Sequence, residues 1–303
     1  MDKLPKITLI TPSLNQAAYL ETCIRSIVEQ DYPRLEYFVF DGGSTDGSVS
    51  VLEKHTADIH FWVSEKDKGQ SDAIAKGIRK STGDIVHWIN SDDYLEPGAL
   101  QAIADAWNPD VGCICGTSRI FSETRESVSH TDVGTDFSLF SKSRIDQPAT
   151  WFSGHFMRNH LPDNDLHLAM DLDLWYRFLL ENPTRNIVQI PDLLVHFREH
   201  ADAKSSKLAL EMLYERAQLA LELRQALAGS KSENRYHSYS NLLDPKRKSQ
   251  IRLGCLDFSL NAYCHLLTKK NGLAKNLGKS ILANDLGFKE WLTFHRIKFS
   301  GGL

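Results

Sequence analysis

Two adjacent carboxylates, Asp92 and Asp93, lie just beyond a short apolar run at residues 85–89. The run is typical of a buried strand, and Asn90 and Ser91 separate it from the acids. Neighbouring like charges repel, and removing them from water is costly unless a cation or hydrogen-bond donors compensate. A divalent metal that carries phosphate oxygens would compensate them, because Mg2+ and Mn2+ prefer oxygen ligands and often take only one or two carboxylates. The alternative is a polar turn in which Asp92 or Asp93 caps the next helix.

Three polar turns, at residues 11–15, 41–48 and 90–93, each follow a predicted strand. Strands that alternate with helices predict βαβ units, and therefore an α/β fold with a mostly parallel central sheet flanked by helices. Ligands of such sheets bind beyond the carboxyl ends of the strands, so the three turns predict a nucleotide or phosphate site. The chain has neither a GxxxxGK[ST] loop nor a GxGxxG fingerprint, so we expect metal to hold the phosphate. The spacing predicts strands at 6–11, 35–40, 59–63, 85–89 and 111–115, and helices at 17–30, 49–55, 72–80 and 97–107.

The rest of the chain divides near residue 205. Residues 117–145 are polar and predict a hairpin or flexible loop; after them we expect a strand at 147–152, a helix at 168–180 and a strand at 187–190. An amphipathic helix at 207–228 and a polar linker at 229–250 follow. Residues 246–303 carry 11 lysines and arginines against three acids. We expect a domain at 1–205 and a helical, basic extension at 206–303, which either caps the domain or docks on anionic lipid.

Composition narrows the class of protein. The 303 residues allow one large or two modest domains, and a hydrophobic fraction of 42% supports a sizeable core. A net charge of -4 gives no case for a nucleic-acid partner. The five cysteines are odd in number and form no CxxC, which favours a reduced compartment. With no signal-peptide pattern and no long apolar run, we expect a cytoplasmic protein, with peripheral contact at the inner face of the membrane as an option.

Residues 6–207 resemble the large family of inverting glycosyltransferases built on the GT-A fold, family 2. One run that carries the resemblance is Ser64-Glu-Lys-Asp-Lys-Gly-Gln-Ser-Asp-Ala-Ile-Ala-Lys-Gly77, which leads through residues 81–84 to Asn90-Ser-Asp-Asp93. The other is Gln147-Pro-Ala-Thr150 followed by Ala169-Met-Asp-Leu-Asp-Leu-Trp175. The chain is most similar to bacterial enzymes that build surface polysaccharides and lipid-linked glycans. The resemblance implies a nucleotide-diphospho-sugar donor and Mn2+ or Mg2+ as cofactor.

The resemblance also implies roles for individual residues on the donor side. The nucleoside would contact the first turn and the base would bond to the acid that ends the second strand: Thr11, Pro12, Ser13 and Asp41. The donor pocket and ribose would contact Asp67, Gln70, Asp72, Asn90 and Ser91. Asp92 would hold the metal on the diphosphate, and His200 would close over it and supply a further metal or phosphate contact. Three positions depart from the family pattern: Gly42 and Asn90 replace acids, and Ala75 replaces an asparagine.

Asp171 matches the acid that serves as general base in this family. The chemistry requires one, because an acceptor hydroxyl keeps its proton near pH 7 until a positioned carboxylate takes it during attack. Inversion also requires attack from the face opposite the leaving diphosphate, so base and metal must lie on opposite sides of the sugar. Asp173 is the rival candidate, two residues on and therefore on a different helical face.

Together these residues predict an inverting glycosyltransferase that moves a sugar to a hydroxyl of a glycan or lipid-linked acceptor in bacterial polysaccharide biosynthesis. One alternative is a sugar nucleotidyltransferase. The first strand is followed by no glycine-rich loop with arginine or lysine, which speaks against that class. The other alternative is a non-catalytic nucleotide-sugar-binding subunit, which Gly42, Asn90 and Ala75 favour.

Overall fold

The computed structural model describes residues 4–182, 186–229 and 234–283. The strands are β1 (Ile7–Ser13), β2 (Leu35–Asp41), β3 (Phe61–Ser64), β4 (Ile85–Trp88), β5 (Tyr94–Leu95), β6 (Cys113–Phe121), β7 (Glu126–His130), β8 (Thr150–Ser153) and β9 (Ile187–Arg198). The helices are α1 (Ala17–Val28), α2 (Ser48–Lys54), α3 (Gln70–Lys80), α4 (Ala99–Ala106), α5 (Asp136–Lys142), α6 (Gly154–Asn159), α7 (Met170–Glu181), α8 (Lys204–Lys207), α9 (Ala209–Leu227), α10 (Pro245–Thr268) and α11 (Leu273–Ala283).

The chain forms two compact units. The first comprises residues 1–131, 145–174 and 182–201, and the second comprises residues 132–144, 175–181 and 202–303. The second unit thus takes two segments from within the first two hundred residues, one of them the C-terminal half of α7. The predicted boundary at residue 205 remains a prediction.

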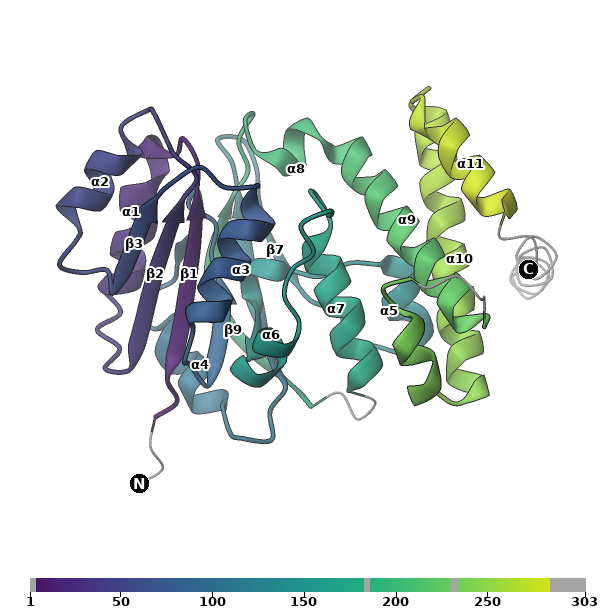
Figure 1. Ribbon diagram of the computed structural model, residues 1–303, viewed down its shortest axis with the longest axis horizontal. Helices are drawn as coiled ribbons and strands as arrows, with labels where there is room; N and C mark the ends of the chain where they lie inside the picture. The colour runs from purple at the N-terminus through teal and green to yellow at the C-terminus, as the bar shows by residue number, and fades with distance from the viewer. Residues whose placement is uncertain (1–3, 183–185, 230–233, 284–303) are drawn as a thin grey trace. The chain divides into compact units, whose positions relative to one another are not determined.

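The first unit is built on one sheet with the strand order β3-β2-β1-β4-β8-β6-β9-β5, and β7 lies beside β6 (Figure 1). The four strands from β3 to β4 are parallel, as the βαβ pattern predicted. Beyond them β8 runs antiparallel to both β4 and β6, and β9 is parallel to β6. The α/β fold with flanking helices is therefore confirmed, and the half of the sheet beyond β4 is mixed.

Alternating side chains of β1 face two helical layers. Ile7 and Leu9 belong to the apolar core that also contains buried residues of α1, α2 and α4. Ile10 points to the opposite face, where it lies against α3. A Cβ on Gly77 of α3 would lie only 2.6 Å from the Ile10 side chain, so the glycine is what allows α3 to approach the strand so closely.

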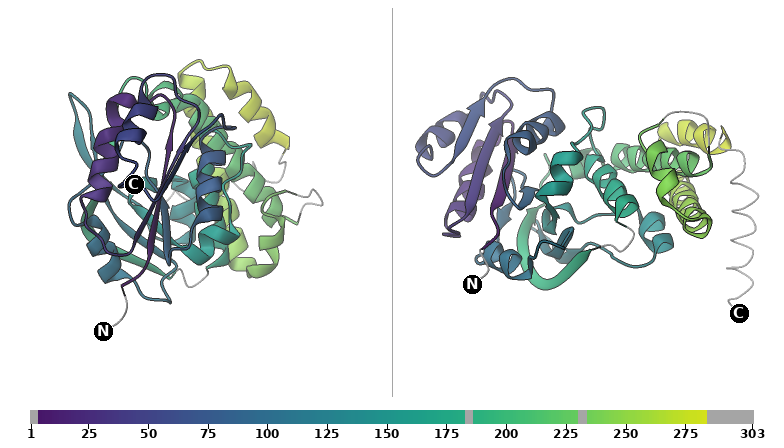
Figure 2. Two further views of the ribbon diagram at one scale, coloured as in Figure 1. Left: turned by 60° about the vertical axis from the view of Figure 1, so that its left-hand side comes forward. Right: turned by 60° about the horizontal axis from the view of Figure 1, so that its bottom comes forward.

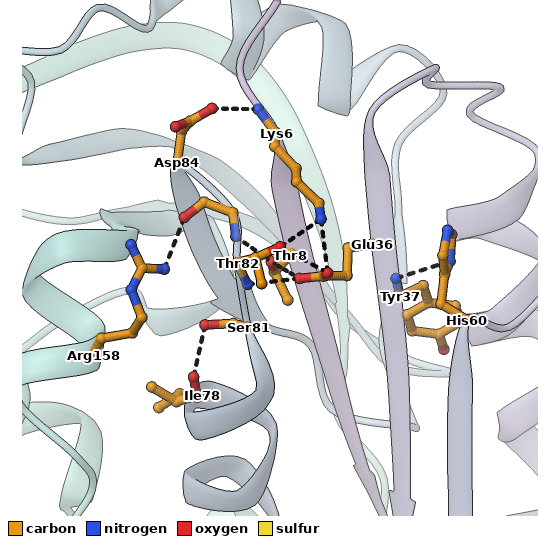
Figure 3. A network of polar contacts seen from close by, with 11 residues as sticks. Lys6, Thr8, Glu36, Tyr37, His60, Ile78, Ser81, Thr82, Asp84 and Arg158 are labelled. Carbon is orange, nitrogen blue, oxygen red and sulfur yellow. Dashed lines mark hydrogen bonds and ion pairs between the residues drawn. The ribbon is translucent and has the colours of Figure 1, made fainter.

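A polar network ties the start of β4 to β1 and β2 (Figure 3). The buried carboxylate of Glu36 accepts hydrogen bonds from Lys6 Nζ at 2.8 Å, Thr8 Oγ1 at 2.6 Å and the Thr82 amide at 2.8 Å. The backbone amide of Lys6 donates to Asp84 at 2.7 Å. These bonds hold β4 at the end opposite the acidic turn at residues 90–93, and so fix the direction in which that turn projects.

The second half of the first unit contains two elements that the sequence did not predict, β5 and α6. The β6–β7 hairpin confirms one of the two structures expected for residues 117–145. The strand β6 continues to Phe121 because its polar second half pairs with β7 on one side and β9 on the other. Residues 187–190 are only the beginning of β9, which runs for 12 residues.

Helices make up most of the described part of the second unit, in which α10 packs against α5, α9 and α11 (Figure 2). Arg247 of α10 donates to Asp136 of α5 at 2.8 Å and to the carbonyl of Leu179 in α7 at 2.8 Å. No helix within the described residues has both the length and the apolar character needed to cross a bilayer.

The prediction of a linker at 229–250 is wrong for its described part. Tyr236, Tyr239 and Leu243 are buried, and α10 begins at Pro245. Asp244 caps this helix by accepting a hydrogen bond from the Arg247 amide. An acidic cap followed by proline at the first helical position favours the start of a helix. This start was not predicted because the charged residues 246–248 made the region look like a polar linker.

Candidate active site

The turns after β1 and β2 lie side by side and are cross-linked. Ser13 pairs with Asp41 in the sheet, and the turns are joined by hydrogen bonds from the Thr45 amide to Asn15 Oδ1 (2.9 Å) and from the Asn15 amide to Ser44 Oγ (2.7 Å). Asn15 takes a φ of +54°, a left-handed conformation that asparagine tolerates well. Asp46 accepts from the amide of Ala17 and so anchors the start of α1. The turn after β4 adjoins them, since the Ile89 amide donates to Ile10 at 3.0 Å.

Asp41, at the end of β2, accepts hydrogen bonds from the turn that follows it. Its carboxylate is buried and accepts from the amides of Gly43 and Ser44 and from the hydroxyls of Ser44 and Ser64. These bonds shape the 41–48 turn and join it to β3. Contact between Asp41 and the base remains a prediction.

The three residues predicted to contact the nucleoside are all buried but differ in what they offer. Thr11 turns its hydroxyl into the core, 3.1 Å from the hydroxyl of Tyr37, so only its backbone remains for a ligand. The hydroxyl of Ser13 is buried and has no hydrogen-bond partner among the described residues. Buried hydroxyls are normally paired, so Ser13 is an exception, but its burial leaves a ligand no exposed surface of this hydroxyl to contact.

Asp67 explains the glycine at position 42. A Cβ on Gly42 would lie 2.9 Å from Oδ2 of Asp67, whose other oxygen accepts from the amide of Gly69 at 2.8 Å. An acidic side chain at position 42 would bring two carboxylates into contact. Gly42 therefore leaves room for Asp67 beside the 41–48 turn. Asp72, the other acid predicted here, forms an ion pair with Lys76 at 3.4 Å.

A short hydrogen-bonded chain runs through Asn90. The side chain of Gln70 donates to Asn90 Oδ1 at 2.8 Å, and Asn90 Nδ2 lies 3.4 Å from Oδ2 of Asp93. An amide can accept from one neighbour and donate to the other, whereas a carboxylate at position 90 could only accept. It would also add a negative charge beside Asp92. Ser91, between Asn90 and Asp92, is buried.

Asp92 and His200 meet at the end of β4. Nε2 of His200 lies 3.1 Å from Oδ2 of Asp92, and both side chains are partly exposed. The carboxylate of Asp92 fits Mn2+ or Mg2+, which would complete their coordination with water and phosphate, whereas the imidazole nitrogen of His200 is a ligand that softer ions prefer to Mg2+. Within the described part of the chain no three His, Cys, Asp or Glu side chains are grouped to hold a metal. Metal binding by Asp92 and His200 remains a prediction.

Asp93 stabilises the segment that carries His200. Its buried carboxylate accepts from the backbone amide of Arg198 at 2.9 Å. Burial, and then the charge of Asp92, raise the pKa of Asp93 well above its usual value. The next helix begins only at Ala99, after Gly98, so the expectation that Asp93 could cap it is wrong.

The first turn of α7 brings Asp171 to the first turn of α3. The Ser71 hydroxyl donates to the carbonyl of Leu166 at 3.0 Å and lies 2.9 Å from Sδ of Met170. This contact holds Asp171 near the helix that carries Gln70. Asp171 is partly exposed, whereas its rival Asp173 has no exposed surface and cannot meet an incoming hydroxyl.

Three residues of this region were not predicted as site residues. Tyr19 of α1 lies against His200 with ring centroids 5.0 Å apart, and Nε of Arg198 donates to the carbonyl of Asp92 at 3.2 Å. Gln147 donates to the carbonyl of Trp88 at 2.9 Å, just before the acidic turn. Two of them had a signal in the sequence: Arg198 lies two positions before His200, and Gln147 begins the run Gln147-Pro-Ala-Thr150. Nothing in the sequence distinguishes Tyr19.

Comparison with known proteins gives a family match and several relatives. The model of glycosyl transferase family 2 matches residues 8–170. Chondroitin synthase of Escherichia coli is 27% identical over 150 residues, which are 48% of this chain and 21% of that protein. The GalNAc(5)-diNAcBac-PP-undecaprenol beta-1,3-glucosyltransferase of Campylobacter jejuni is 29% identical over 157 residues, 50% of each chain. The chain thus spans half or less of the length of these two relatives.

Solved structures share the fold. S. aureus TarS 1-349 in complex with UDP-GlcNAc gives a TM-score of 0.55 at 16% identity, over 92% of this chain and 89% of that one. The mannosyltransferase PcManGT of Pyrobaculum calidifontis, in complex with GDP-Man and Mn2+, gives a TM-score of 0.54 at 19% identity. The match covers 97% of this chain and 84% of that one. These similarities confirm the GT-A fold predicted from the sequence.

Proposed function

This chain belongs to glycosyl transferase family 2, and we propose that it transfers a sugar from a nucleotide-diphospho-sugar to a hydroxyl of an acceptor, with inversion at the anomeric carbon. One observation carries the proposal. Asp92 and His200, 108 positions apart, meet at the strand ends where the 11–15 and 41–48 turns converge. The Ser71 contact brings the first turn of α7, with Asp171, to the neighbouring α3.

Asp92 and His200 would hold Mn2+ or Mg2+, which when bound stabilises the leaving diphosphate as a Lewis acid. Ser13 and Asp67 would orient the nucleoside, and Asp67 would do so from the space beside Gly42. Gln70 and Asn90 would form the wall of the donor pocket. Of the remaining donor-side predictions, Pro12, Asp41 and Ser91 lie at the surrounding strand ends, and Asp72 lies in α3.

Asp171 would act as the general base. Its carboxylate takes the proton of the acceptor hydroxyl while that oxygen bonds to the anomeric carbon and the bond to the diphosphate breaks. The diphosphate leaves with the bonding electron pair. Partial exposure supports this role for Asp171, because a base must meet the acceptor at the surface of the pocket.

We propose a glycan or lipid-linked acceptor and a role in bacterial polysaccharide biosynthesis. The names of the relatives, a chondroitin synthase and an undecaprenol-linked glucosyltransferase, support both. A cytoplasmic location with peripheral membrane contact would suit such an acceptor. Of the basic C-terminal region, the described part exposes Lys269, Lys270, Lys275 and Lys279, and residues 284–303 lie outside it.

A donor panel tests the proposal. The chain is incubated with UDP- and GDP-sugars, Mn2+ and candidate acceptors, and release of nucleoside diphosphate is followed. Transfer predicts nucleoside diphosphate and a new glycosidic bond. Formation of pyrophosphate from a nucleoside triphosphate and a sugar 1-phosphate would support the nucleotidyltransferase instead. Donor binding without turnover of any donor would support the non-catalytic subunit.

A further inference from the structure

Arg198, the last residue of β9, is fastened to the acidic turn at two points. Its backbone amide donates to Oδ1 of Asp93 at 2.9 Å, and its Nε donates to the backbone carbonyl of Asp92 at 3.2 Å. Both bonds involve the turn that carries the candidate metal ligand. The position of the Arg198 side chain is therefore set by the same turn as that of the Asp92 carboxylate.

Aromatic rings from three elements surround the Arg198 guanidinium. Its Cζ lies 5.0 Å from the ring centroid of Tyr19, 4.8 Å from that of Phe121 and 5.9 Å from that of Tyr94. Tyr94 is itself stacked on His196, with centroids 4.4 Å apart and planes 8° from parallel. Cation–π contact with three rings orients the guanidinium without neutralising its charge.

No carboxylate forms an ion pair with this guanidinium among the residues that the structure describes. Its one hydrogen bond within those residues uses Nε, so the two terminal nitrogens keep their donors for another partner. The side chain is only half-buried, so a ligand can reach it. A planar, permanently charged group with two free amino nitrogens suits the bidentate binding of a phosphate.

Tyr19 joins this guanidinium to the candidate metal site. Its ring centroid lies 5.0 Å from Arg198 Cζ and 5.0 Å from the centroid of the His200 ring. His200 in turn lies against Asp92. We propose that Arg198 contacts the diphosphate of the donor directly, as a cationic partner separate from the metal, and that Tyr19 is a positioning residue for Arg198 and His200. The inference rests on the proposed function, since it assigns a further ligand to the same donor.

Calorimetry with matched ligands tests the contact. UDP and GDP are titrated into the full chain with Mn2+ and again with EDTA, and uridine and guanosine serve as ligands that lack phosphate. We expect Arg198→Gln to weaken nucleoside diphosphate binding about 10- to 100-fold, the size expected for a lost charge-assisted bond, and to leave nucleoside binding within about twofold. The loss should persist in EDTA. Arg198→Lys should recover part of it.

Three controls separate the possible outcomes. Arg25→Gln removes an exposed arginine of α1 that pairs with Glu29, and should change neither affinity. Tyr19→Leu should weaken diphosphate binding and Tyr19→Phe should not, because the ring is what positions Arg198. Thermal unfolding of each variant establishes that it is folded.

Equal losses for nucleoside and diphosphate in Arg198→Gln would overturn the inference, since they would indicate a structural role. A loss confined to the Mn2+ titrations would also overturn it, because Arg198 would then act through Asp92. Unchanged affinity would exclude the contact while leaving the proposed function intact. If the wild-type chain binds neither UDP nor GDP, the proposed donor class fails first, and the inference fails with it.

Discussion

Replacing Glu36 by glutamine should remove a pH-dependent part of the stability of the first unit. Burial alone would raise the pKa of Glu36, but hydrogen bonds from Lys6, Thr8 and Thr82 outweigh it and lower the pKa from 4.5 to about 2. At about 1.4 kcal/mol per pH unit, this difference corresponds to about 3 kcal/mol of stability. Because the folded-state pKa is the lower one, this contribution is complete above pH 4.5 and is lost as the pH falls toward 2.

Urea unfolding at several pH values measures this contribution. At pH 7 Glu36→Gln should be less stable than wild type by about 3 kcal/mol, and the difference should shrink by about 1 kcal/mol at pH 3.5. Glu29→Gln is the matched control, because Glu29 forms an exposed pair with Arg25 and should change stability by less than about 1 kcal/mol. If the stability difference between wild type and Glu36→Gln is the same at pH 7 and pH 3.5, the hydrogen bonds of Glu36 do not lower its pKa in the folded state.

Three further changes probe the site and the core beneath it. Asp92→Ala should weaken Mn2+-dependent binding of nucleoside diphosphate by at least about tenfold, since a charged ligand is lost; unchanged calorimetric binding would contradict the metal role. Gly42→Asp should weaken donor binding by placing a second carboxylate against Asp67, a repulsion of roughly 1 to 4 kcal/mol, and Asp67→Asn in the same chain should restore part of it. Burial lowers the pKa of His87 to about 3, so its neutral form stabilises the fold above pH 6.5 and this contribution falls by about 1.4 kcal/mol per unit as the pH drops toward 3. His87→Leu should therefore flatten urea stability between pH 6 and 4, and an unchanged slope would count against it.

The parallel half of the sheet could be predicted because its information is local. Each strand from β1 to β4 is a mostly apolar run followed by a polar turn. Most motif residues follow those strands, so their convergence follows from the direction of the strands alone. Asp92 at the end of β4 is the clearest case, and the structure places it beside His200.

The parts that could not be predicted depend on contacts between distant segments. Tyr94 and Leu95 form a strand only because they pair with His196 and Val195 of β9. The direction of the Thr11 hydroxyl is set by Tyr37 on the neighbouring strand, and the burial of Asp173 by its surroundings in the folded chain. Tyr19 occupies a half-exposed helical position that no periodicity distinguishes, and only the folded chain brings it to Arg198.

Replacing Asp171 by asparagine tests most directly whether this residue is the general base of sugar transfer. Transfer rate and donor affinity are measured on the same preparations of wild type and Asp171→Asn, with the best donor of the panel and Mn2+. We expect the rate to fall by about 100-fold or more, while the donor dissociation constant stays within about twofold. A loss of donor affinity as large as the loss of rate, or transfer at the wild-type rate, would contradict this role of Asp171.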